Sequence, residues 1–217
     1  MATSFQLAMA FAFSFYLAKA APPVVSMEME QAKANPVNMT VYYESLCPGC
    51  NFFITQELHP LWPKIKDLDL MTVNLLPFGN AQERRIGFQW EFTCQHGKAE
   101  CTGNIVETCM IHYYPDTTKQ LNMVACFNAN YIGTLGADWQ ASLQNCSKTG
   151  VDVEKIKTCV TGHEGNNLEH IMAMNTGPHG YTPFIMLDGV VNPNAEDHLL
   201  SEVCRVYKGV KPPICSQ

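Results

Sequence analysis

Two cysteines separated by two residues are the first feature of this sequence that could do chemistry. Cys47-Pro48-Gly49-Cys50 follows one apolar run and precedes another. Such a pair could be a redox centre, half of a zinc site or a tight structural disulfide. In a redox centre, one thiolate attacks a substrate disulfide and the second thiol then displaces the substrate. The order of the residues makes Cys47 the nucleophile and Cys50 the resolving thiol.

The two other interpretations of the cysteine pair have less support. Zinc ribbons usually supply a second ligand pair at similar spacing, and no second C-x-x-C is present. The nearest Cys- and His-rich segment, residues 94–112, has spacings that match no common zinc pattern. A disulfide closing so short a loop adds little chain-entropy stabilisation. We therefore expect a redox pair with no metal and no bound cofactor, which an external thiol must reduce.

The elements around the pair should form a βαβ unit. The run "MTVYYE", Met39–Glu44, is rich in β-branched and aromatic residues and predicts a strand. A helix should follow Cys50 and kink or end early at Pro60 or Pro63. The apolar run in "DLDLMTVNLLPFG" predicts a second strand, buried on both faces. This order places Cys47 at a helix N-terminus, where free N–H groups and the macrodipole favour a thiolate. One face of the helix carries Ile54, Leu58, Leu61 and Ile65.

The last part of the chain returns to an α/β pattern. "TPFIMLDGVV" predicts a hairpin that turns at Asp188-Gly189, and Asn194 could cap a helix that starts at Ala195. Thioredoxin-like folds carry a cis-proline before a late strand, facing the C-x-x-C, and Thr182-Pro183 stands at the corresponding place. We expect Pro183 to be cis and to present the Thr182 backbone to an extended substrate. The predicted fold is α/β and thioredoxin-like, with an inserted helical segment.

The N-terminus predicts entry into the secretory pathway. Residues 1–20 are mostly apolar and end in Ala18-Lys19-Ala20, which is typical of a cleaved signal peptide; a membrane anchor is the alternative. Residues 21–38 should form a flexible leader, and 39–217 the thioredoxin-like domain, with the insertion at about 80–165. No later segment is apolar enough to cross a membrane.

Secretory entry determines how the other cysteines are interpreted. In an oxidising compartment most cysteines pair, and the sequence does not choose among the possible pairings. The sequons at Asn38 and Asn145 are expected to carry glycans, the second being hindered if Cys146 pairs early. The expected structural cysteines are Cys94, Cys101, Cys109, Cys126, Cys146, Cys159, Cys204 and Cys215.

Composition narrows the range of partners. Hydrophobic residues make up 47% of the chain and charged residues 16%, which favours a packed core over disorder. The net charge of −6 and the absence of a basic stripe give no support to nucleic-acid binding. The expected partners are disulfide-containing protein substrates, and the sequence leaves the oligomeric state open.

A longer motif in the middle of the chain resembles a known family. "CQHGKAECTGNIVETC", residues 94–109, fits C-Q-H-G-x2-E-C-x2-N-x4-C at every fixed position. This pattern is similar to that of the gamma-interferon-inducible lysosomal thiol reductase family. The resemblance implies a thioredoxin-like domain with a helical insertion that reduces protein disulfides in acidic compartments, lysosomal or secreted. It also implies Cys47 and Cys50 as the active pair.

The chemistry at acidic pH sets a demand on Cys47. Useful attack near pH 5 needs a thiol pKa of about 5 to 6, or about 4 kcal/mol of preferential anion stabilisation. A helix terminus contributes typically about 0.3–1 kcal/mol, so hydrogen bonds from Cys50 and from backbone N–H groups must supply the rest. Many thioredoxins carry a buried acid six residues before the first cysteine. Val41 occupies that position, and strand alternation is expected to point Glu44 elsewhere.

The polar residues of the long motif have two interpretations. Gln95, His96, Glu100 and Asn104 either line the active site or hydrogen-bond internally around the disulfides, and we favour the second. The sequence as a whole predicts a thiol oxidoreductase acting mainly as a reductase. The alternatives are a net disulfide oxidase or isomerase, and a non-enzymatic, disulfide-rich secreted binding protein with an inert C-x-x-C.

Overall fold

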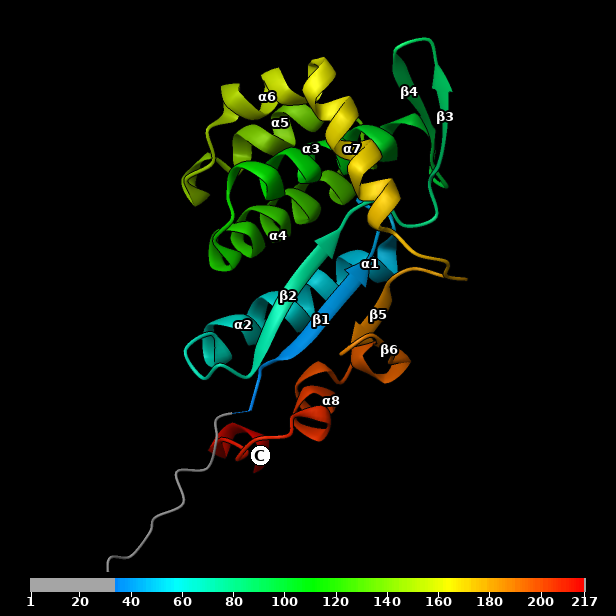
Figure 1. Cartoon of the computed structure of the whole chain (residues 1–217). Helices are drawn as coiled ribbons and strands as arrows, with labels where there is room; N and C mark the ends of the chain where they lie inside the picture. The colour runs from blue at the N-terminus through cyan, green and yellow to red at the C-terminus, as the bar shows by residue number, and fades with distance from the viewer. Residues whose placement is uncertain (1–33, 217) are drawn as a thin grey trace, which may run out of the picture. The chain divides into compact units, whose positions relative to one another are not determined.

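The computed structural model of the chain describes residues 34–216, so the predicted signal peptide and most of the leader lie outside the described residues. Its main sheet has the strand order β2-β1-β5-β6 (Figure 1). Strand β1 runs parallel to β2 and antiparallel to β5, and β6 pairs antiparallel with β5. The prediction of a mixed α/β, thioredoxin-like fold is confirmed. The strands are β1 (Val37–Tyr42), β2 (Met71–Leu76), β5 (Phe184–Leu187) and β6 (Val190–Val191).

A continuous helical segment connects β1 to β2 and completes the predicted βαβ unit. Of the two outcomes expected at Pro60 and Pro63, a kink or an early end, the early end is wrong, because helical structure continues to Ile65. A π-helical turn precedes Pro60, and within it the His59 N–H donates to the Ile54 carbonyl, five residues back. Pro60 then lies in the first turn of the next helix, where its missing N–H costs little. The three parts are α1 (Pro48–Phe52), η1 (Phe53–Leu58) and α2 (His59–Ile65).

Strand β2 is less buried than predicted. Thr72 and Asn74 are exposed, whereas Leu75 and Leu76 are buried. The reason is its position, because β2 is an edge strand and pairs only with β1. An edge strand of a mixed sheet can keep one face in water, as antiparallel sheets do.

The insertion begins with a hairpin that the sequence did not predict. Strands β3 (Gln82–Ile86) and β4 (Gln89–Thr93) pair with each other in a separate two-stranded sheet. Strand β3 is polar and largely exposed, whereas β4 alternates exposed polar residues with the partly buried Trp90 and Phe92.

Five α-helices and one short 3-10 turn follow the hairpin and gather beyond the carboxyl ends of β1 and β2 (Figure 1). Helical structure continues to Asn175, past the predicted limit near residue 165. The segment has its own apolar core, which includes Val106, Met123, Phe127 and Ile156. These elements are α3 (Lys98–Tyr113), α4 (Thr117–Gly133), α5 (Trp139–Asn145), η2 (Ser147–Thr149), α6 (Val153–Thr161) and α7 (His163–Asn175).

All eight predicted structural cysteines are paired. Two disulfides lie within the helical segment, one joins the end of the hairpin to α3, and one joins the last helix to the C-terminal turn. The pairs are Cys94–Cys101, Cys109–Cys159, Cys126–Cys146 and Cys204–Cys215.

The C-terminal region confirms the hairpin and corrects the helix start. Asp188 and Gly189 both have positive φ, 51° and 76°, as a two-residue hairpin turn requires. The last helix, α8 (Leu199–Val206), begins after the position predicted from Asn194, because Pro193–Glu196 forms a separate 3-10 turn, η3. A further 3-10 turn, η4 (Pro213–Ser216), ends the described chain.

The helical insertion and the sheet share the main core. Leu121 and Val124 of α4 belong to the same buried cluster as Met39 and Val41 of β1 and Phe53 of η1. Within the described residues, no helix combines the length and apolar character that a membrane crossing needs. The shared core fixes the insertion against the βαβ unit that carries the two free cysteines.

Candidate active site

The cysteine pair lies where β1 gives way to helix α1. Cys47 is the N-cap residue, and its sulfur accepts a hydrogen bond from the Cys50 backbone N–H at 3.3 Å. Pro48 occupies the first helical turn, where a missing N–H leaves no bond unmade. Both cysteines are free thiols; Cys47 is 6% exposed and Cys50 is fully buried. The outer sulfur is thus the one that a substrate can reach.

The surroundings separate the acidities of the two thiols. The pKa of Cys47 is lowered to about 6, first by the hydrogen bond from the Cys50 thiol, against the opposing effect of burial. The Cys50 backbone N–H, the Thr182 hydroxyl and the charge of His96 lower it further. Burial and the neighbouring Cys47 raise the pKa of Cys50 well above its ordinary value. At pH 5 a thiol of pKa 6 is about 9% thiolate, so Cys47 remains a usable nucleophile in acid.

The segment before β5 faces the cysteine pair. The Thr182–Pro183 peptide bond is cis, as predicted. A Cβ added at Gly49 would lie 3.3 Å from Cδ of Pro183, which shows how closely the proline approaches the helix start. The Thr182 hydroxyl donates to the Cys47 sulfur at 3.6 Å, and that sulfur lies 3.8 Å from the Thr182 carbonyl. The sequence predicted a role for the Thr182 backbone but missed its side chain.

Glu44 faces the active site, contrary to the sequence-based expectation. Strand β1 ends at Tyr42, so strand alternation no longer determines the direction of Glu44. Its carboxyl is fully buried and accepts a hydrogen bond from the Thr182 hydroxyl at 3.3 Å. Burial raises the pKa of Glu44 to about 7, assisted by the charges of Glu100 and Cys47. An acid therefore lies beside the reactive sulfur although Val41 occupies the usual position.

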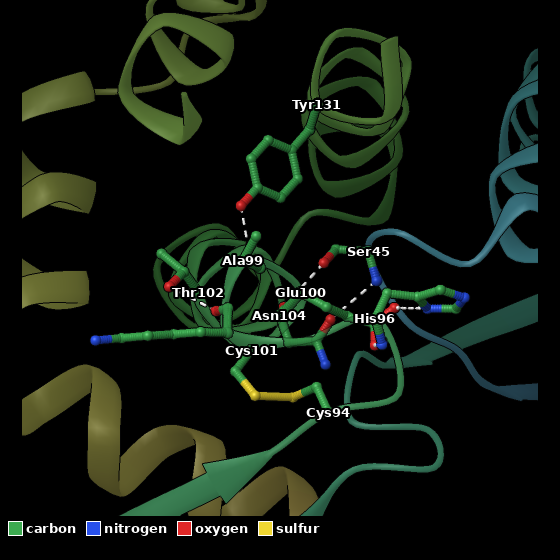
Figure 2. Close-up of a disulfide and its surroundings, with 10 residues drawn as sticks. Ser45, Cys94, His96, Ala99, Glu100, Cys101, Thr102, Asn104 and Tyr131 are labelled. Carbon is green, nitrogen blue, oxygen red and sulfur yellow. Dashed lines mark hydrogen bonds and ion pairs between the residues drawn. A yellow bond between two sulfur atoms is a disulfide. The ribbon is translucent and has the colours of Figure 1, made fainter. Parts of the chain in front are cut away.

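The long motif binds the loop that leads into the cysteine pair (Figure 2). The Ser45 backbone N–H donates to Asn104 Oδ1 at 2.9 Å, and the Ser45 hydroxyl donates to the Glu100 carbonyl at 3.0 Å. His96 bonds to the Glu100 carboxylate twice, through its backbone N–H at 2.8 Å and through Nδ1 at 2.5 Å. The motif residues thus hydrogen-bond internally, as favoured, and their bonds also extend to the loop before the cysteine pair.

A second contact connects the motif to Thr182. Asn80 Nδ2 donates to Gln95 Oε1 at 2.9 Å and to the Thr182 hydroxyl at 3.4 Å. Asn80, in the turn after β2, carried no signal in the sequence. Its amide links the first polar residue of the long motif to the residue that contacts Cys47.

A metal at this site has little structural support. The cysteines that zinc would need in addition, Cys94, Cys101 and Cys109, are all in disulfides. Donor atoms of Glu44, His96 and Glu100 do lie within 4.8 Å of one another. Both Glu100 oxygens, however, already accept hydrogen bonds from His96. We assign no metal to this cluster.

A thioredoxin-like sheet with a free C-x-x-C at a helix start and a facing cis-proline defines a thiol–disulfide oxidoreductase. Solved structures share the fold: the reduced disulfide-bond oxidoreductase DsbG of Mycobacterium tuberculosis has a TM-score of 0.55 at 18% identity, covering 83% of this chain and 82% of its own. Chlamydia trachomatis DsbA has a TM-score of 0.50 at 13% identity, covering 81% and 89%.

Sequence comparison identifies the family. The family described as gamma interferon inducible lysosomal thiol reductase (GILT) matches residues 38–150. The protein named gamma-interferon-inducible lysosomal thiol reductase in Carassius auratus is 36% identical, over 85% of this chain and 74% of the relative. The protein of the same name in Mus musculus is also 36% identical, over 83% of this chain and 72% of the relative. A gamma-interferon-responsive lysosomal thiol protein of Arabidopsis thaliana is 32% identical, over 85% and 77%. The chain belongs to the gamma-interferon-inducible lysosomal thiol reductase family.

Proposed function

We propose that this protein reduces disulfides in protein substrates at acidic pH, with Cys47 as the nucleophile and Cys50 as the resolving thiol. The observation that carries the proposal is the opposite displacement of the two pKa values, downward for Cys47 and upward for Cys50. A nucleophile must be a thiolate at the working pH, whereas a resolving thiol must not compete with it for the substrate. The names of the relatives agree with this activity.

The catalytic cycle has two exchanges and one reduction. The Cys47 thiolate attacks a substrate disulfide and forms a mixed disulfide, and one substrate thiol leaves. Cys50 then attacks the Cys47 sulfur, releases the second substrate thiol and leaves an oxidised pair. No bound cofactor takes part, so an external thiol returns the pair to the dithiol. Pro183 and the Thr182 backbone hold the substrate segment in an extended conformation beside Cys47.

We place this activity in the secretory pathway, in lysosomes or outside the cell. The predicted signal peptide and the names of the relatives support this location. Glycans at Asn38 and Asn145 belong to the same proposal. Both side chains are exposed, but Asn145 adjoins Cys146, which is paired with Cys126. Early closure of that disulfide would lower glycan occupancy at Asn145.

Reduction of insulin disulfides tests the proposal. The wild-type protein, supplied with a small thiol, should reduce insulin at pH 5 and at pH 7, and Cys47→Ser should abolish the reaction. Cys50→Ser should accumulate a mixed disulfide with insulin at Cys47, which mass spectrometry can locate. A Cys204→Ser/Cys215→Ser variant is the matched control, because it removes two cysteines of a structural disulfide in another part of the chain.

The outcome also separates the alternatives. No reduction at either pH, together with an unreactive Cys47, would contradict the proposal and favour a binding protein with an inert cysteine pair. Rapid oxidation of reduced test proteins with no reduction of insulin would instead favour a net oxidase.

A further inference from the structure

The acidic and basic side chains of the long motif form a row that leads toward Cys47. His96 lies in the loop before α3, and its side chain is 38% exposed. Its Nδ1 contacts the Glu100 carboxylate, which is fully buried at the start of α3. The buried carboxyl of Glu44 comes next, with donor atoms within 4.8 Å of both neighbours. The row therefore runs from solvent into the active site.

The Thr182 hydroxyl closes the gap between Glu44 and the sulfurs. It lies 3.3 Å from Glu44 Oε2 and 3.6 Å from the Cys47 sulfur, and its interaction with Cys50 opposes the rise in the pKa of that thiol. A hydroxyl has one proton to donate but can accept at the same time. Thr182 can thus pass a proton between the carboxyl and a sulfur by receiving one and releasing another.

One atom of Glu44 has no partner in the structure. Glu44 Oε1 is buried and makes no hydrogen bond, although buried polar groups are almost always satisfied. An orphaned oxygen costs less on a neutral carboxylic acid than on a carboxylate. This agrees with a pKa of about 7, so that Glu44 carries a proton at pH 5.

We infer that Glu44 is the proton donor and acceptor for the thiol exchange, and that the His96–Glu100 pair reloads it from solvent. This inference rests on the proposed function and assigns a role to residues of the long motif. Because Glu44 acts through Thr182, these residues transfer protons rather than touch the substrate.

The proton balance follows the two exchanges. When the Cys47 thiolate breaks the substrate disulfide, the leaving sulfur takes a proton from Thr182, and Thr182 takes the Glu44 proton. Glu44 is then a carboxylate and accepts the Cys50 proton by the reverse path. The Cys50 thiolate attacks the Cys47 sulfur, and the second substrate sulfur leaves and takes the Glu44 proton through Thr182. The His96–Glu100 pair then returns one proton from solvent to Glu44, and this is the single proton that the net reaction consumes.

The groups that face Glu44 influence its protonation state at different pH values. They are Glu100 from α3, His96 from the loop before it, and the cysteines of the active pair. Partial burial works against a charged His96, but its bonds to Glu100 raise its pKa above the ordinary value. Below pH 7 Glu44 is therefore protonated, whereas above pH 7 Glu44 is ionised and has no proton to give.

The test compares two substrates whose leaving thiols differ in acidity. A peptide with an alkyl disulfide releases a basic thiolate that needs a proton, whereas an aryl disulfide of nitrobenzoate releases a stable thiolate. At pH 5, single-turnover reduction of the alkyl disulfide by Glu44→Gln should be about 100-fold slower than by wild type, and the aryl disulfide should react within about threefold of wild type. The alkylation rate of Cys47 in the same variant should not fall.

His96 provides an independent arm of the test. His96→Asn should slow the alkyl reaction about tenfold, and added imidazole should restore it by carrying protons in its place. His112→Asn is the matched control, since His112 is also half exposed and lies 3.9 Å from another glutamate, Glu164. The His112→Asn variant should reduce the alkyl disulfide at the wild-type rate, and added imidazole should not change that rate.

The results separate the inference from the proposed function. Equal losses on both disulfides, or no loss on the alkyl one, would overturn the proton-transfer role. A wild-type protein that reduces neither substrate would instead refute the proposed function. If Glu44→Gln does not fold, alkylation of the normally buried Cys50 would reveal it. The imidazole response of His96→Asn then decides, and a lack of rescue overturns the inference.

Discussion

Replacing the buried Glu107 should change how stability depends on pH. This side chain of α3 is fully buried, and neither of its oxygens has a hydrogen bond of normal geometry, although the Tyr43 hydroxyl faces it. Burial raises the pKa of Glu107 from 4.5 to about 8. The folded protein thus keeps a proton that the unfolded chain releases near pH 4.5.

The sign and size of the effect follow from proton linkage. Between pH 4.5 and pH 8 the folded state binds more protons than the unfolded state, so the free energy of unfolding falls as the pH rises. For a native pKa of about 8, the loss between pH 5 and pH 7.5 is about 3 kcal/mol. Burial also raises the pKa of Glu169, so its contribution has the same sign. The fold should therefore be more stable in acid than at neutral pH.

Urea unfolding at pH 5 and pH 7.5, followed by tryptophan fluorescence, measures this loss. Glu107→Gln cannot ionise, so the variant should lose about 3 kcal/mol less than wild type between the two pH values. Glu154→Gln is the control, because that side chain is 81% exposed and pairs only with Lys157 on the surface. An equal loss in wild type and Glu107→Gln would refute the assigned protonation state.

Two further predictions concern the active site and the disulfides. Thr182→Val removes a hydrogen bond to the Cys47 sulfur, so it should raise the pKa of that thiol and slow its alkylation at pH 5 by about two- to tenfold. A curve of alkylation rate against pH that is identical to that of wild type would contradict the role of this contact. The disulfide between Cys109 and Cys159 spans 50 residues, so replacing both by Ala should lower the free energy of unfolding by about 4 kcal/mol in urea, and a loss below about 1 kcal/mol would contradict this expectation.

Local patterns predicted the elements that carry the cysteine pair. The β-branched run gave β1, and the turn at Asp188-Gly189 fell where positive φ is needed. The hairpin β3–β4 escaped prediction because β3 is charged and exposed, and the alternation in β4, with Trp90 and Phe92 partly buried, spans only five residues. The helix before β2 was predicted to kink or end early at Pro60 or Pro63, and its continuation was missed because proline rules do not anticipate a π-helical turn.

The site itself could be predicted only in part. Only two residues separate Cys47 and Cys50, so their motif is recognised from the local sequence. The contacts around Cys47 could not be predicted in this way. Thr182 lies 135 residues away, and the Glu100 carbonyl binds Ser45 because α3 docks on the loop before the pair. The direction of Glu44 depends on where β1 ends, which is the least certain property of a strand read from sequence. The groups that surround the cysteine pair are therefore set by long-range packing, which the local sequence does not reveal.

The acidity of Cys47 is the most direct test of the whole account. Alkylation of the reduced protein by iodoacetamide, measured from pH 4 to pH 9 with modification mapped to Cys47 by mass spectrometry, gives the pKa of the nucleophile. The account predicts a single titration centred near pH 6, absent from Cys47→Ser, with Cys50 unmodified in the same range. A midpoint near pH 8 to 9, that of an ordinary thiol, would contradict it.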